Sequence, residues 1–143
     1  MRLFAHLCLL LLISCGESPL LNHKMLGDLP SRALNPQTAQ RFNRFDMDFE
    51  MAWSDGCPNS TDNCSFELTL SKAMPAGSTL VAKPWMPSMG HGSGELPTVS
   101  EVGPQTWSVQ EVYFIMPGIW QLFLTMKLSD GSTDEIILDY HIH

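Results

Sequence analysis

The feature that most constrains the fold is a two-residue alternation of apolar and polar side chains in several separate segments. In residues 45–53 the apolar positions are Phe45, Met47, Phe49, Met51 and Trp53, and polar or small residues lie between them. The same period recurs in residues 66–71 and 120–128. A period of two places alternate side chains on opposite faces of a strand, so each segment is predicted to be a strand with one buried face.

Further strands are predicted from signals other than a clear alternation. Residues 129–132 read Ser-Asp-Gly-Ser, a turn signal that predicts a hairpin between residues 119–128 and 135–143. No segment shows sustained helical spacing, and ten prolines and ten glycines interrupt the strands. The sequence therefore predicts an all-β, immunoglobulin-like antiparallel sandwich of about seven strands. We place them at residues 44–53, 65–71, 79–85, 96–102 (a short edge strand), 107–114, 118–128 and 134–143.

This strand order predicts which connections meet. Successive strands of a sandwich run to and fro between its two ends, so alternate connections lie at the same end. The connection after residue 85, the corner after residue 114 and the end of the last strand are then expected together. Met74 is expected at the opposite end, as a packing residue.

The connection after residue 85 carries Met86, Met89 and His91 between prolines and glycines, and the corner after residue 114 carries Met116. Thioether sulfur with imidazole is a soft ligand set that favours Cu(I). The four residues are predicted to form a copper site, with the ring face of Trp85 as a cap over the cation. The alternative is that the methionines fill gaps in the core and that the histidine is merely solvated.

A second candidate metal site, ranked below the first, is formed by His141 and His143. They occupy alternate positions of the last predicted strand, so both imidazoles are expected on one face, where they could share a divalent ion. Fraying of the chain end argues against such a site.

The two methionine segments together resemble a known family. Residues 85–92 read Trp-Met-Pro-Ser-Met-Gly-His-Gly, and about 25 residues later the chain reads Tyr-Phe-Ile-Met-Pro-Gly-Ile-Trp-Gln-Leu. This pattern resembles the YtkA-like and FixH-like domains of the bacterial envelope over residues 66–140. The resemblance implies a small immunoglobulin-like sandwich associated with copper handling, or with assembly of copper-containing respiratory oxidases. Its signatures fall on Met86, Pro87, Met89 and His91, and on residues 116–120.

The amino-terminal residues predict export. Arg2, an apolar run over residues 3–13 and the small residues before Cys15 follow the order of a secretory leader, and the run is too short to span a bilayer. Residues 12–15, Leu-Ile-Ser-Cys, resemble the bacterial lipobox, so residues 1–14 are predicted to be cleaved and Cys15 to be lipidated. The alternative is an ordinary leader with a chance cysteine. FixH-like proteins carry a spanning helix in place of this lipobox.

The rest of the chain divides into a tether and one domain. Residues 15–41 are rich in Pro, Asn, Ser and Leu without periodicity, as a flexible tether would be, and residues 42–143 have the size of a single domain. The expected location is the cell envelope, lipid-anchored in the outer membrane and facing the periplasm. Copper-trafficking or oxidase-assembly proteins are the expected partners.

Cys57 and Cys64 remain after the leader is removed and Cys15 is lipidated. In an oxidising compartment they are predicted to form a disulfide, and the alternative is a pair of thiolate metal ligands.

The net charge and the absence of catalytic motifs argue against two other classes of protein, nucleic-acid-binding proteins and enzymes. The chain has 8 basic against 15 acidic residues and a net charge of −7, and its basic residues are scattered, which argues against nucleic acid as a partner. There is no nucleophile elbow and no His-Glu-x-x-His motif, so no enzymatic activity is predicted. The remaining alternative to copper binding is a docking module that uses the Met- and Trp-rich end as an apolar patch.

Overall fold

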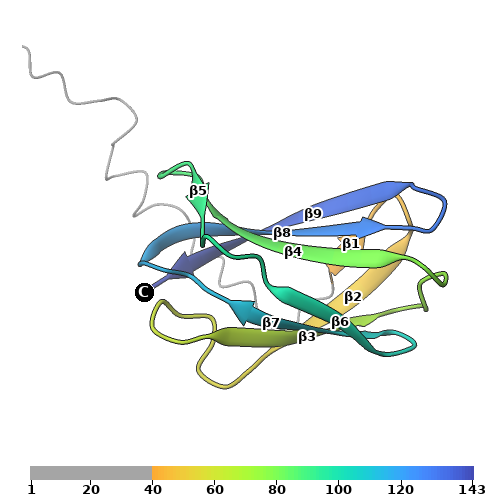
Figure 1. The fold of residues 1–143 in the computed structure, drawn as a ribbon, viewed down its shortest axis with the longest axis horizontal. Helices are drawn as coiled ribbons and strands as arrows, with labels where there is room; N and C mark the ends of the chain where they lie inside the picture. The colour runs from red at the N-terminus through yellow and green to blue at the C-terminus, as the bar shows by residue number, and fades with distance from the viewer. Residues whose placement is uncertain (1–39) are drawn as a thin grey trace, which may run out of the picture. The chain divides into compact units, whose positions relative to one another are not determined.

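The computed structural model describes residues 40–143, which form two antiparallel sheets packed face to face (Figure 1). The five-stranded sheet has the order β1-β2-β3-β7-β6, and the four-stranded sheet has the order β5-β4-β8-β9. The strands are β1 (Gln40–Phe42), β2 (Met47–Trp53), β3 (Cys64–Leu70), β4 (Thr79–Met86), β5 (His91–Gly92), β6 (Thr98–Gly103), β7 (Thr106–Val112), β8 (Gly118–Lys127) and β9 (Thr133–Ile142).

The prediction of an all-β sandwich is confirmed. Without the two short strands β1 and β5, the sheets read β2-β3-β7-β6 and β4-β8-β9, which is the order of a constant-type immunoglobulin domain. These seven strands correspond to the seven predicted segments, and β6 lies at a sheet edge as expected. The predicted hairpin is present as β8 and β9, which pair from Gly118↔Ile142 to Lys127↔Thr133.

The largest difference between the predicted and the observed strand boundaries lies at the start of the domain. The alternation at residues 44–46 predicted strand, but residues 43–46 form a turn in which Asp46 has a φ of 49°, and β1 precedes it. Asp is one of the few side chains that tolerate this left-handed conformation. The carboxylate of Asp134 accepts a hydrogen bond from the backbone N–H of Arg44 at 2.7 Å, so a contact distant in sequence helps to hold the turn.

The core fills the space between the sheets and follows the predicted period. Nearly all inward positions of β2, β3 and β8 are buried, whereas their alternate positions are exposed or half-buried. The largest fully buried side chains include Trp120, Phe42, Phe49 and Phe114. Burial of these apolar surfaces is the main source of stability for such a domain.

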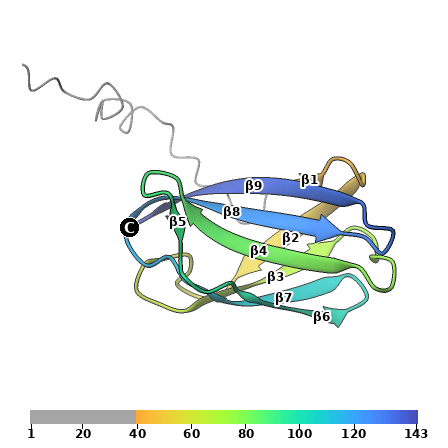
Figure 2. The same ribbon diagram turned by 45° about the horizontal axis from the view of Figure 1, so that its top comes forward.

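The predicted gathering of connections is also confirmed. Residues 54–63, 86–92, 113–117 and 141–143 lie at one end of the sandwich, which we call the C-terminal pole (Figures 1 and 2). The hydroxyl of Ser60 donates a hydrogen bond of 2.8 Å to the carbonyl of His143 and so joins the two sheets there.

The predicted leader, the predicted lipidation at Cys15 and nearly all of the predicted tether lie outside the described residues. Gln40 and Arg41, the last two residues assigned to the tether, belong to β1. In residues 40–143 there is no helix that could span a membrane.

Candidate metal site at the C-terminal pole

Met86, Met89 and His91 lie on a tight hairpin rather than in the open loop that the sequence suggested. Met86 ends β4, His91 begins β5, and the two are directly paired. The carbonyl of Met86 accepts hydrogen bonds from the N–H groups of Met89 at 3.2 Å and Gly90 at 3.0 Å. Gly90 has a φ of 68°, a conformation that glycine adopts without strain. The hairpin therefore holds Met89 at its tip.

Met86 is a core residue, with 5% of its surface exposed. Its terminal methyl group lies against Gly118, where a Cβ atom would collide with it. Gly118 also has a φ of 142°, a conformation that favours glycine. The contact brings the β4–β5 hairpin against the Met116-Pro117-Gly118 turn, so the two predicted ligand segments meet.

Met89 differs from Met86 in its exposure, which is 57%. An apolar side chain this exposed at the tip of a tight turn contributes little to the core. The side chain is therefore open to solvent, as a ligand for an exchangeable ion must be.

His91 is half-buried and has one ring nitrogen fixed by the backbone. Its Nδ1 lies 2.9 Å from the carbonyl oxygen of Gly92. A carbonyl only accepts hydrogen bonds, so Nδ1 must carry the proton and donate it. In the neutral ring Nε2 then holds the free lone pair, which is the state that a metal-binding imidazole needs.

Met116 is half-buried and packs against the core cluster. Its backbone carbonyl accepts a hydrogen bond of 2.9 Å from the indole Nε1 of Trp120, which is completely buried. Trp120 in turn meets Phe114 edge to face, with ring centroids 5.5 Å apart. The turn that carries Met116 is thus fixed by the core beneath it.

Trp85 does not occupy the position expected of a cap. Its neighbour Met86 points into the core, so Trp85 lies on the opposite, outer face of β4. The Nζ atom of Lys83 lies 4.8 Å from the centre of the Trp85 ring and is the cation that this ring meets. This placement does not favour a cap over an ion held by Met86 and His91.

His141 and His143 lie on one face of the β9 end, as predicted, and this is the outer face. Both are exposed, and their ring centroids are 4.4 Å apart.

An aromatic cluster lies between the sheets beneath the C-terminal pole. Trp53 meets Tyr140 edge to face at 5.6 Å, and Tyr140 lies 6.0 Å from Phe114. The Tyr140 hydroxyl donates to the sulfur of Met51 at 3.4 Å. Burial raises the pKa of Tyr140 to about 12.

This raised pKa predicts a loss of stability in alkali. The unfolded chain releases the Tyr140 proton near pH 10, whereas the folded chain retains it to about pH 12. The contribution is therefore fully present below pH 10 and falls by about 1.4 kcal/mol per pH unit as the pH rises from 10 towards 12. Urea denaturation at pH 9, 10 and 11 measures it. Tyr140→Phe should show a flatter decline, and identical slopes for both proteins would contradict the prediction.

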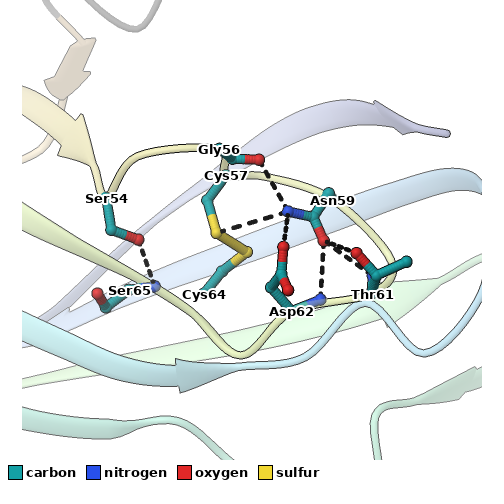
Figure 3. Close-up of a disulfide and its surroundings, with 8 residues drawn as sticks. All are labelled: Ser54, Gly56, Cys57, Asn59, Thr61, Asp62, Cys64 and Ser65. Atoms are coloured by element: carbon teal, nitrogen blue, oxygen red, sulfur yellow. Dashed lines mark hydrogen bonds between the residues drawn. A yellow bond between two sulfur atoms is a disulfide. The ribbon is translucent and has the colours of Figure 1, made fainter.

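The disulfide predicted from the sequence is present between Cys57 and Cys64, within the C-terminal pole (Figure 3). Asn59 organises the loop that it closes. Its Nδ2 donates to the Gly56 carbonyl and the Asp62 carboxylate, each at 2.8 Å, and its Oδ1 accepts from the N–H groups of Thr61 and Asp62. The loop therefore presents Ser60, next to Asn59, to the end of β9.

Loss of this disulfide is expected to lower the free energy of unfolding by about 2 kcal/mol, because a short closed loop restricts the unfolded chain modestly. Urea denaturation of Cys57→Ala/Cys64→Ala against the wild type measures it. Hydrogen exchange should also accelerate at the end of β9, since the loop holds the His143 carbonyl. Unchanged exchange at Ile142 and His143 would show that the loop does not restrain them.

Sequence reasoning missed two groups at this pole. Ser60 was not singled out, because nothing local to a serine shows that it reaches a carbonyl 83 residues away. The Gly92 carbonyl was missed as well, since backbone groups leave no mark in residue identity. The available signal for this contact was the pair His91-Gly92 in the sequence.

The described part of the chain holds no group of three or more His, Cys, Asp or Glu side chains placed to bind a metal ion. This absence concerns sites built from His, Cys, Asp and Glu. It does not concern a site built from methionine thioethers. Searches of protein-family models, curated proteins and solved structures gave no match to this chain.

Proposed function

We propose that this protein is a non-enzymatic envelope lipoprotein whose sandwich domain binds and relays Cu(I) at the C-terminal pole. Met89 and His91 are the ligands within reach of solvent. Two further thioethers lie behind them: Met86, at the β4 end of the same hairpin, and Met116, on the turn that the hairpin contacts at Gly118. Thioether and imidazole together suit Cu(I), and an open set of this kind suits exchange with a partner.

The observation that carries the proposal is the hydrogen bond from His91 Nδ1 to the Gly92 carbonyl at 2.9 Å. It leaves Nε2 as the metal-binding atom before any ion arrives, and such a bond to the second ring nitrogen is usual for metal-binding histidines. The tip thioether of Met89 on the same tight hairpin, 57% exposed, supplies a soft partner.

Competition titration with Cu(I) tests this function. The full chain carries Cys8→Ser and Cys15→Ser so that no free thiol competes, and ascorbate is the reductant because thiol reagents would open the disulfide. His91→Gln is expected to weaken Cu(I) binding by about tenfold or more, since even the loss of an outer-sphere partner commonly costs that much. His23→Gln is the matched control. Equal affinities in all three proteins would contradict the proposal.

An apolar docking patch is the second candidate, and one observation favours it. Met89, Leu96 and Ile115 are exposed by 57%, 61% and 48%, and Met89 and Ile115 both lie at the C-terminal pole. Met89→Leu separates the two functions, because it removes the sulfur but keeps the apolar side chain. Weaker Cu(I) binding in this variant supports copper, and unchanged binding supports docking.

The envelope location has its own test. Mass spectrometry of the mature amino terminus is expected to show a chain that begins at a diacylglycerol-modified Cys15. An unmodified chain that begins elsewhere would remove the membrane anchor from the proposal. The expected partners are copper-trafficking or oxidase-assembly proteins of the same compartment.

A further inference from the structure

We infer that His141 and His143 form a second metal site, for a borderline divalent cation and Cu²⁺ above all, on the outer face of β9. The site uses no sulfur and does not involve His91, so it does not depend on the Cu(I) proposal. Three properties of the β9 end support it: the spacing of the two rings, the restraint of the backbone and the access from solvent.

The spacing of the two imidazoles allows both rings to bind one ion. A ligating nitrogen lies about 2.0 Å from the metal, and the ring centre about 1.1 Å beyond it, so two imidazoles at a right angle on one ion have centres about 4.5 Å apart. The centroids of His141 and His143 are 4.4 Å apart.

The backbone of the β9 end is restrained at Ile142 and at His143. Ile142 itself pairs with Gly118 in the β8–β9 ladder and is buried. The His143 carbonyl accepts the 2.8 Å hydrogen bond from Ser60, which belongs to the loop closed by the Cys57–Cys64 disulfide. Fraying, the objection raised from the sequence, is therefore countered by a link between the two sheets.

The surroundings admit a hydrated cation. β9 is the edge strand of its sheet, and both histidines are exposed. Asp139 and Glu135 lie on the same outer face and give it negative charge, which attracts cations. Because the described residues place no third His, Cys, Asp or Glu with the pair, the protein supplies two nitrogen ligands and water the others. Among divalent first-row ions such a set binds Cu²⁺ most tightly.

Titration with Cu²⁺ alone tests this site, on the full chain without a histidine tag and with glycine as the competing ligand. The chain carries Cys8→Ser and Cys15→Ser, because free thiols bind and reduce Cu²⁺. Electron paramagnetic resonance of the bound ion is expected to show nitrogen splitting from two imidazoles. His141→Gln and His143→Gln should each weaken binding by at least tenfold and reduce the splitting to one imidazole. His23→Gln is the matched control and should change neither the affinity nor the splitting.

Two results would overturn the inference. Unchanged Cu²⁺ affinity in the His141→Gln/His143→Gln double variant would show that another group, such as the amino terminus, holds the ion. A loss of only twofold in each single variant would show that the two imidazoles bind separate ions and form no chelate. Both histidines are exposed, so the variants are expected to fold, and their circular dichroism should match the wild type.

Discussion

Trp120→Ala is expected to lower the free energy of unfolding by about 3–5 kcal/mol, the usual cost of removing a large aromatic side chain from a core. Trp120 is completely buried, packs edge to face on Phe114 and donates its indole N–H to the Met116 carbonyl. A domain of this size commonly has a total stability of about 5–15 kcal/mol, so the loss is a large fraction of it. Urea denaturation measures the change.

Trp120→Phe is the control that separates packing from the hydrogen bond. It keeps much of the apolar volume but leaves the Met116 carbonyl without its donor, so the expected loss is smaller, about 1–3 kcal/mol. Hydrogen exchange near residues 115–118 should accelerate in this variant. A loss below about 1 kcal/mol for Trp120→Ala would show that this side chain does not hold the C-terminal pole together.

Met89→Leu/His91→Gln is expected to weaken Cu(I) binding by well over tenfold, more than His91→Gln alone, because the same ion loses two of its ligands. Both residues lie on the hairpin whose carbonyl at Met86 fixes the turn, and neither substitution touches that backbone. The titration is the chelator competition in ascorbate described above.

Met74→Leu/His23→Gln is the matched control for this pair. It removes one thioether, from the connection between β3 and β4, and one imidazole, from the predicted tether. It should leave the affinity within about twofold of the wild type. If both double variants lost Cu(I) affinity equally, the binding would be unspecific. If neither did, the hairpin would not be the site.

The sequence predicted the strands well because one face of each sheet is buried. Alternation in residues 47–53 and 120–127 records which side chains face the core, and a one-residue shift would expose all of them. The pole at which the connections gather followed from strand order alone. The disulfide followed from two cysteines in an expected oxidising compartment.

Short strands and contacts distant in sequence could not be predicted in this way. β1 has three residues and β5 has two, which is too few for a period to show. Prolines and glycines around Met86 suggested a loop, but its pairing with His91 and its contact with Gly118 place it in the core. The hydrogen bond from Ser60 to His143 depends on how the two sheets meet, which no local pattern encodes.

X-ray absorption at the copper edge of the Cu(I)-loaded full chain, with Cys8→Ser and Cys15→Ser, tests the central claim most directly. We expect sulfur scattering from methionine thioethers together with one imidazole, and we expect the imidazole signal to disappear in His91→Gln and to persist in His141→Gln. A spectrum of oxygen and nitrogen neighbours without sulfur, or an imidazole signal that survives His91→Gln, would contradict a Cu(I) site on the β4–β5 hairpin.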